Sequence, residues 1–333
     1  MNTTVARPGD ALAEDSETTP LLRVEGLNVT YRLAGGQLRA VRDASFDVAR
    51  GEIFGLVGES GSGKSTLLTA LMRLLPHGTG VTADRLELNG TDLLGMSEGR
   101  LRKLRGREIG LVPQRPMTSL SPVTPVAAQL RRLTGGEVDD ERMHELLTDV
   151  GLGGLKRRLG DYPFQFSGGQ LQRMLIAVAI LAREPGLVLA DEPTTTLDAT
   201  VQAQVLRLMV DLRERLGNTV VLVTHDLGVV AQVCDRVGVM YGGRLVEVAR
   251  TQDLFDNPQH PYTQALLAAM PSNRPAGARL NPIPGSVSGA HALPGCPFAP
   301  RCARADHVCR EVDPLPVESA AATVRCHHPG GTE

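Results

Sequence analysis

The chain has no tryptophan, few aromatic residues and no long apolar segment. Aromatic residues make up 3% of its 333 residues, so a surface that binds bases or sugars chiefly by stacking is not expected. The longest apolar run, Met174–Ala182, is far shorter than the roughly 20 residues that a membrane-spanning helix needs. Residues 1–20 lack the basic-then-apolar order of a secretory signal. We therefore expect a flexible leader and a chain that stays in the cytosol.

An excess of charge of one sign is also lacking. Lys and Arg total 35 against 37 Asp and Glu, which argues against a nucleic-acid binder held by a basic face. Hydrophobic residues make up 42%, so wholesale disorder is excluded. The length predicts one large domain and a smaller one.

Short apolar runs alternate with segments of helical spacing along the middle of the chain. This alternation predicts an α/β fold with much parallel pairing, because each helix returns the chain to the same end of the sheet. The predicted buried strands are Ile53–Val57, Ile109–Val112, Leu187–Ala190 and Val220–Thr224, and the predicted helices are Glu137–Val150, Leu171–Leu181 and Val201–Leu216. Val239–Val248, with two central glycines, predicts a hairpin.

A glycine-rich segment follows the first of these strands. Gly58–Ser65 fits the pattern G-x-x-x-x-G-K-[ST] and precedes a helical segment that Pro76 closes. Backbone N–H groups in such a loop converge on phosphate oxygens, and the helix N-terminus adds partial positive charge. Lys64 supplies a charge for the terminal phosphates, and the Ser65 hydroxyl can bind Mg²⁺. The pattern predicts a nucleoside triphosphate site.

Three titratable residues follow two other predicted strands. Asp191 and Glu192 come after Leu187–Ala190, and His225 follows Val220–Thr224. An acidic residue here can hold Mg²⁺ through water, and the next carboxylate can polarise an attacking water. Parallel sheets bind ligands at the carboxyl edge of their strands, which favours a phosphate-sensing role for His225. A helix N-cap is the structural alternative for the acidic pair.

A second candidate anion site lies between the glycine-rich loop and the acidic pair. Ser167, Gly168, Gly169 and Gln170 precede a predicted helix, so bare amides stand at its N-terminus. One nucleotide site does not need two such loops. We therefore expect this segment to serve a nucleotide held by another chain.

In this order, the motifs resemble those of the ATP-binding cassette ATPases over roughly residues 22–250. The resemblance implies a P-loop NTPase fold over residues 21–250, with an antiparallel β subdomain and a helical subdomain at about 115–175. It assigns ATP contacts to Tyr31, Gly58, Glu59, Ser60, Gly61, Ser62, Gly63, Lys64, Ser65, Thr66, Gln114, Asp191 and His225.

The resemblance also implies roles in catalysis and assembly. Glu192, His225, Gln114 and Lys64 would be catalytic, and Mg²⁺ would be held through Ser65, Gln114 and Asp191. The signature Ser167–Gln170 would face the γ-phosphate on a partner chain, and Asp198 would lie in the loop that joins the dimer.

Further segments are similar to the oligopeptide/dipeptide importer subfamily, D-type subunit. They are Met117–Pro122, Pro193–Leu206, Phe255–Pro271, Pro282–Gly285 and Gly295–Cys302. This similarity implies an ATPase on the cytoplasmic face of the membrane, paired with an F-type ATPase subunit. Two permeases and an extracytoplasmic binding protein would complete the importer. Nickel, glutathione-like or saccharide cargo is the alternative, as is a soluble ATPase outside transport. A cassette that binds ATP without hydrolysing it is disfavoured by Glu192 and His225.

Cysteine is scarce and unevenly placed. Four of the five cysteines, Cys296, Cys302, Cys309 and Cys326, lie in the C-terminal part, spaced C-x5-C, C-x6-C and C-x16-C. Cytosolic thiols are normally reduced, so a metal site is favoured over disulfides. Four thiolates can hold a [4Fe–4S] cluster, as the subfamily's motif does, with Zn²⁺ or a mixed Cys/His zinc site as the alternative. Residues 251–333 would form a small C-terminal extension around this motif.

Overall fold

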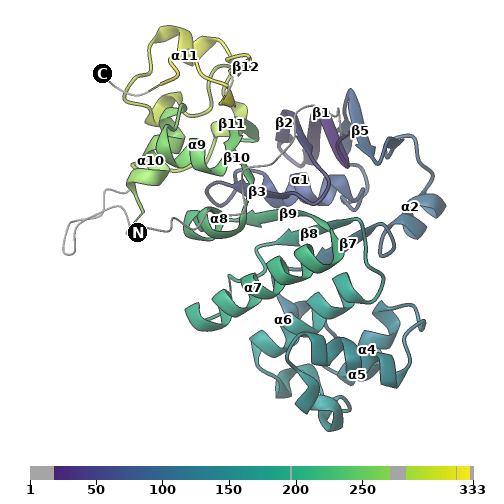
Figure 1. Ribbon diagram of the computed structural model, residues 1–333. Coiled ribbons are helices and arrows are strands. Elements are labelled where there is room, and N and C mark those ends of the chain that lie inside the picture. Colours follow the sequence, from purple (N-terminus) through teal and green to yellow (C-terminus); the bar gives the residue numbers. More distant parts are fainter. Residues whose placement is uncertain (1–18, 196, 271–282, 320, 331–333) are drawn as a thin grey trace, which may run out of the picture.

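The computed structural model describes residues 19–195, 197–270, 283–319 and 321–330 (Figure 1). The first strands of the described chain form an antiparallel sheet, drawn at the upper right of Figure 1. Its order is β2-β1-β5-β6, and β4 also pairs with β1. The strands are β1 Leu22–Leu33, β2 Gly36–Val48, β4 Gly80–Thr82, β5 Arg85–Leu88 and β6 Thr91–Asp92. The β subdomain that the resemblance implies is therefore present.

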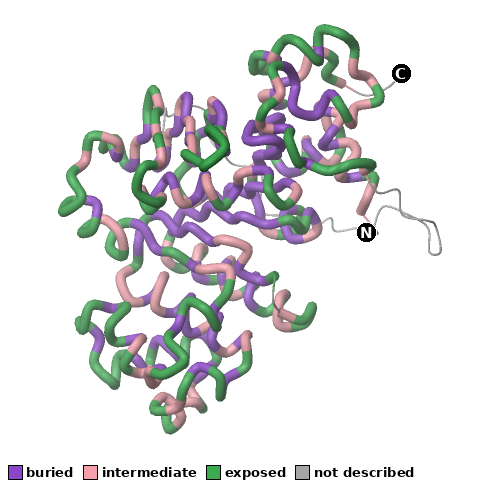
Figure 2. The backbone as a smooth tube through the Cα atoms, turned by 180° about the vertical axis from the view of Figure 1, so that it is seen from behind, coloured by how far each residue is buried: buried purple, intermediate pink, exposed green. Residues whose placement is uncertain are grey.

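The second sheet has the strand order β12-β13-β11-β10-β3-β9-β8-β7. Its parallel part runs from β10 to β7. The strands are β3 Ile53–Val57, β7 Ile109–Val112, β8 Leu187–Asp191, β9 Thr219–Thr224, β10 Arg236–Tyr241, β11 Arg244–Arg250, β12 Val317–Glu318 and β13 Ala322–Val324. The central strands are nearly continuous apolar runs because both faces are covered (Figure 2). The strands predicted from the sequence are confirmed, as is the hairpin of β10 and β11.

Helices cover this sheet and build a separate helical layer, drawn at the bottom of Figure 1. They are α1 Lys64–Leu71, α2 Glu98–Leu104, α3 Pro116–Ser119, α4 Val126–Leu133, α5 Asp140–Asp149, α6 Gly168–Ile176, α7 Ala199–Leu216 and α8 Leu227–Val233. Short 3₁₀ turns at Gly153–Arg158 and Pro163–Gln165 lead into α6. The predicted helix Leu171–Leu181 is not one regular helix, since a π-helical turn at Ala177–Leu181 continues α6.

The C-terminal extension adds α9 Thr251–Asp256, α10 Pro261–Ala268 and α11 His307–Glu311, with 3₁₀ turns at Ala290–Ala292 and Ala299–Arg301. The expectation of a separate small domain is not met. Strand β13 pairs with β11, so the extension lengthens the large sheet by two strands. Phe298, Cys296 and Val324 belong to the same buried cluster as the parallel strands. The extension therefore shares the core of the large sheet.

No helix among the described residues is both long and apolar enough to cross a bilayer.

Candidate nucleotide site and cysteine site

The glycine-rich loop between β3 and α1 has the backbone that its sequence predicts. Gly58, Gly61 and Gly63 have positive φ angles of 152°, 79° and 109°. A Cβ atom on Gly58 would collide with the Met240 carbonyl oxygen, and one on Gly63 with that of Ala40. Only glycine therefore fits both positions. The N-terminus of α1 opens directly onto this loop, which is the geometry of a phosphate site.

Lys64 lies inside the curve of the loop and is 5% exposed. Its ammonium donates to the carbonyls of Gly58 at 2.7 Å and Glu59 at 3.0 Å. Burial lowers the pKa of Lys64, and the carboxylates of Glu192 and Asp191 oppose that shift. Additional negative charge from phosphate groups would favour the ammonium form further.

Ser65 and Asp191 meet beside Lys64. The Ser65 hydroxyl donates to Asp191 Oδ1 at 3.0 Å. Burial raises the pKa of Asp191, and the hydrogen bond from Ser65 partly counters it. A hydroxyl and a carboxylate so close together are hard oxygen ligands of the kind that Mg²⁺ prefers, so these residues fit the predicted ion.

Three side chains contact the Glu192 carboxylate, and two of them come from distant parts of the chain. Its Oε2 accepts a hydrogen bond from Gln114 Nε2 at 2.9 Å and lies 3.3 Å from His225 Nδ1. The Thr195 hydroxyl donates to the same oxygen at 2.8 Å. Glu192 has a φ of 43°, in the left-handed region that side chains other than glycine rarely adopt. Such a backbone conformation costs about 1–3 kcal/mol.

Tyr31 lies next to the nucleotide loop, at the far end of β1. Its hydroxyl donates to Thr66 Oγ1 over 3.4 Å, so the ring stands by the first turn of α1. The ring is half-buried, which leaves it available to a ligand. This position is compatible with the adenine contact that the resemblance implies.

The signature segment forms the start of α6. Ser167 Oγ accepts from the Gln170 amide at 3.2 Å, and Gln170 Oε1 accepts from the Ser167 amide at 3.0 Å. This reciprocal pair is a capping box. Gly169 packs against Val201 of α7, and Asp198 caps α7 by accepting from the Val201 amide at 3.0 Å. The signature and the Asp198 loop therefore form one unit.

The structure thus brings together Lys64, Ser65, Gln114, Asp191, Glu192 and His225, which the sequence places far apart. Reasoning from the sequence missed Thr195, although the hydroxyl-rich run after Glu192 was a signal. It also missed Tyr262, His291 and Arg301 of the extension, which contact the glycine-rich loop from outside. Tyr262 and Arg301 lie in segments that resemble the subfamily, but nothing in the sequence linked any of the three residues to the glycine-rich loop.

The four C-terminal cysteines converge in space. They line one small cavity together with His260, Arg304, His327 and His328. None of the five cysteines forms a disulfide. Burial raises the pKa of the Cys296 thiol to about 11, and the three other thiols of the group add to this shift. A bound cation would reverse this effect, because metals bind the thiolate.

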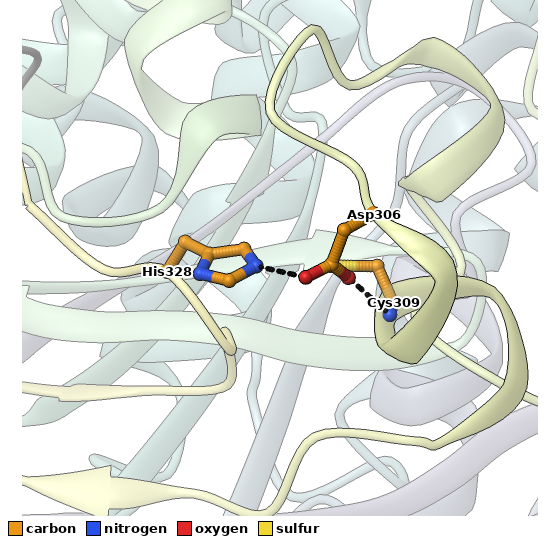
Figure 3. Close-up of side chains that lie close together, drawn as sticks. All are labelled: Asp306, Cys309 and His328. Carbon is orange, nitrogen blue, oxygen red and sulfur yellow. Dashed lines mark hydrogen bonds and ion pairs between the residues drawn. The ribbon is translucent and has the colours of Figure 1, made fainter.

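A second possible ligand set lies at the edge of this cavity. Ligand atoms of Asp306, Cys309 and His328 lie within 4.8 Å of one another (Figure 3). His328 Nε2 is 3.0 Å from Asp306 Oδ2, and Asp306 Oδ1 accepts from the Cys309 amide at 2.9 Å. Asp306 therefore caps α11, which explains its position without a metal. The set contains one of the four thiols.

Cys234, the remaining cysteine, is a core residue. It lies at the end of α8, is 9% exposed and belongs to the buried cluster around the parallel strands. Burial strongly raises the pKa of its thiol. Cys234 is therefore a small side chain of the core and not part of the cysteine cavity.

Comparisons with known proteins agree with this geometry. The family description "ABC transporter" matches residues 41–195, and "Oligopeptide/dipeptide transporter, C-terminal region" matches residues 246–309. The chain is 42% identical over 315 residues to the dipeptide transport ATP-binding protein DppD of Bacillus subtilis, covering 92% of this chain and 94% of that protein. It is 46% identical over 305 residues to a probable peptide ABC transporter ATP-binding protein of Sinorhizobium fredii, covering 89% and 90%.

Solved structures share the fold over about 70% of this chain. CbiO1 of Clostridium perfringens, part of an ABC transporter complex, matches with a TM-score of 0.59 and 27% identity, covering 71% of this chain and 91% of that one. The ATP-binding cassette MJ0796, solved as a dimer with ADP and Pi, matches with a TM-score of 0.58 and 28% identity, covering 69% and 98%. The chain therefore belongs to the ABC transporter family, as an ATP-hydrolysing subunit that carries the oligopeptide/dipeptide transporter C-terminal region.

Proposed function

We propose that this chain drives the import of oligopeptides or dipeptides across a cell membrane by binding and hydrolysing ATP. The contacts of Glu192 with Gln114, His225 and Thr195 carry the hydrolytic part of the proposal. The names of the relatives and the match of the C-terminal region support peptide cargo. Nickel, saccharides and glutathione-like molecules remain the competing cargoes.

In the proposed reaction, Lys64 and the amides of the glycine-rich loop bind the triphosphate. Ser65 and Asp191 would hold Mg²⁺, with Gln114 completing its surroundings, and this ion would neutralise charge on the phosphates. Glu192 polarises the attacking water, and His225 lies close enough to orient that carboxylate and to sense the γ-phosphate.

The signature supports a dimer with two sandwiched nucleotides. Within this chain Gly169 packs against Val201 of α7, and we expect its amide and the Ser167 hydroxyl to face a nucleotide on a second chain. Each ATP would then have ligands on both chains, and hydrolysis would remove that bridge. The second chain would be an F-type homologue, and the pair would bind peripherally beneath two permeases that receive peptide from a binding protein.

For the cysteine cavity we propose a [4Fe–4S] cluster held by Cys296, Cys302, Cys309 and Cys326. Their convergence on one cavity supports a shared group, and four thiolates are the ligand set of such clusters. Zinc is the alternative. Iron and acid-labile sulfide should be found in stoichiometric amounts in anaerobically purified protein, and zinc without iron would overturn the cluster.

The transport proposal is tested in proteoliposomes. The chain is purified with its co-expressed permeases and ATPase partner, and ATP turnover is measured with a binding protein and a panel of di- to pentapeptides, free amino acids, Ni²⁺ and saccharides. Peptide should stimulate turnover and accumulate inside. Stimulation by Ni²⁺ or a saccharide but by no peptide would contradict the peptide assignment.

A further inference from the structure

The extension holds the glycine-rich loop from its outer side. The contacts reach Glu59 and Gly61, two positions at which the pattern G-x-x-x-x-G-K-[ST] allows any residue. Arg301 Nη1 donates to both carboxylate oxygens of Glu59 at 3.0 Å. His291 Nε2 lies 2.8 Å from the Gly61 carbonyl oxygen, and Tyr262 Oη accepts from the Glu59 amide at 2.9 Å. Lys64 holds the same loop from inside.

Arg301 is itself firmly placed. Its side chain is 6% exposed and donates to the carbonyls of Pro284 at 2.7 Å and Ile283 at 3.0 Å. Its Nη1 also lies 3.2 Å from the Tyr241 hydroxyl. The next residue in the chain is Cys302, which lines the cysteine cavity. The position of the guanidinium therefore depends on the fold of the extension beside that cavity.

The negative charge of Glu59 connects these contacts to the free energy of ATP binding. The Glu59 carboxylate belongs to the loop itself, and its charge opposes the lowering of the Lys64 pKa by burial, so it lies close enough to act on charges in the phosphate site. An unpaired carboxylate at this place would repel a triphosphate, and a guanidinium within hydrogen-bond distance cancels most of its field. His291 adds a restraint on shape, because it ties the carbonyl of Gly61, where the loop turns with positive φ.

We propose that Arg301 and His291 are positioning residues for the nucleotide loop, so that a correctly folded extension is a condition for tight ATP binding. Arg301 neutralises Glu59, and His291 fixes the turn at Gly61. The proposal rests only on ATP binding by the family and not on the cargo, so its failure would leave the transport proposal untouched.

A purely structural role is the alternative. Arg301 could simply tie the extension to the cassette, and its loss would then lower stability without any link to the charge of Glu59. The two roles differ in one respect. If neutralisation matters, removing the Glu59 charge should rescue a variant that lacks Arg301. If Arg301 is only a tie, that second substitution should rescue nothing.

The experiment is a double-substitution cycle on the full chain. Binding of a β,γ-imido ATP analogue with Mg²⁺ is measured by calorimetry for Arg301→Met, Glu59→Gln and the double variant. Arg301→Met should raise Kd about tenfold, the size of effect that losing one charge-assisted pair produces. Glu59→Gln should change Kd by no more than about threefold, and the double variant should match it. Arg310→Met on exposed α11 is the matched control and should bind normally.

Two results would overturn the proposal: a Kd within about twofold of the parent for Arg301→Met, or a double variant as weak as that single one. If Arg301→Met does not fold, Arg301→Lys takes its place. Lysine keeps the charge but not the paired donors to Pro284 and Ile283, so Kd should stay within about threefold while the unfolding temperature falls. A tenfold weaker Kd with lysine would contradict neutralisation.

His291 is tested by steady-state kinetics. His291→Ala should raise the KM for ATP severalfold and leave kcat close to that of the parent, because the loop binds less well but Glu192 is unchanged. His291→Gln keeps a donor that can reach a carbonyl and should restore much of the KM. Equal KM values for the alanine variant and the parent would remove His291 from the proposal.

Discussion

The cassette and the extension place their functional groups by different means. In the cassette, Lys64, Asp191 and His225 follow the ends of adjacent parallel strands, so the backbone ladder of the sheet sets their geometry. In the extension, the described elements are short, and β12 has only two residues. Cys309 lies in the short helix α11, the other three cysteines of the extension lie outside regular elements, and Arg301 is held by the carbonyls of Pro284 and Ile283.

Arginine side chains form hydrogen bonds and ion pairs at the boundary between the two regions. Arg42 is 4% exposed and donates to the Leu293 carbonyl at 3.2 Å and to Asp313 at 3.4 Å. Arg325 of the extension pairs with Asp43, and Arg244 pairs with Asp313. Buried arginines of this kind are costly unless every partner is in place. The cassette is built around its own sheet, whereas the extension is joined to that sheet by strand pairing, by shared core packing and by long-range ion pairs.

The largest expected effect lies in the cassette. Glu192→Gln should lower ATP turnover by at least about 100-fold, because the amide cannot polarise water as a general base does. ATP binding should persist, since Lys64 and Ser65 are unchanged. Phosphate release and analogue binding measure the two properties.

The matched control is Glu184→Gln. Glu184 lies before β8, whereas Glu192 lies after it. Glu184 is exposed and has a similar positive φ, of 46°. It should hydrolyse ATP at the parent's rate. Turnover by Glu192→Gln at the parent's rate would remove Glu192 from the catalytic role.

The next prediction compares the loss of one cysteine from the extension with the loss of one from the cassette. If the four thiols hold the proposed cluster, Cys326→Ala should release it and lower the free energy of unfolding by about 2 kcal/mol or more, since metal binding is coupled to folding. Cys234→Ala removes the same sulfur from the cassette core and should cost about 1 kcal/mol with the metal retained.

Metal analysis and calorimetric unfolding of both cysteine variants make this comparison. Metal content that is unchanged in Cys326→Ala would show that this thiol is not a ligand. Metal loss in Cys234→Ala would show that the extension depends on the cassette core more than on its own thiols.

The same contrast explains how much the sequence could predict. Asp191, Glu192 and His225 were found because each follows an apolar strand, and the ends of parallel strands share one edge. The Arg301–Glu59 pair spans 242 residues, and no period or spacing links its members. The left-handed backbone of Glu192 was equally invisible, because the contacts with Gln114 and His225 that accompany it join distant parts of the chain.

The joining of β13 to β11 was missed for a related reason. Its three residues, Ala322–Val324, are too few to show the alternation that marks a strand, and only pairing with β11 makes them one. The apolar pattern of a sequence identifies helices and strands that are long enough for the pattern to repeat. Short elements that exist through their neighbours require the structure.

The smallest expected effect tests how closely the signature packs within the cassette. A Cβ atom on Gly169 would lie 2.5 Å from Val201 Cγ1, whereas one on Gly168 would meet Leu197 Cδ2 at 3.6 Å, an ordinary contact. Gly169→Ala should therefore cost about 1–3 kcal/mol of stability through overpacking. Gly168→Ala should be neutral or slightly stabilising, because alanine favours the helix. Chemical unfolding measures the stability of both variants. Equal stabilities of Gly169→Ala and Gly168→Ala would mean that α7 shifts to make room for the added methyl group.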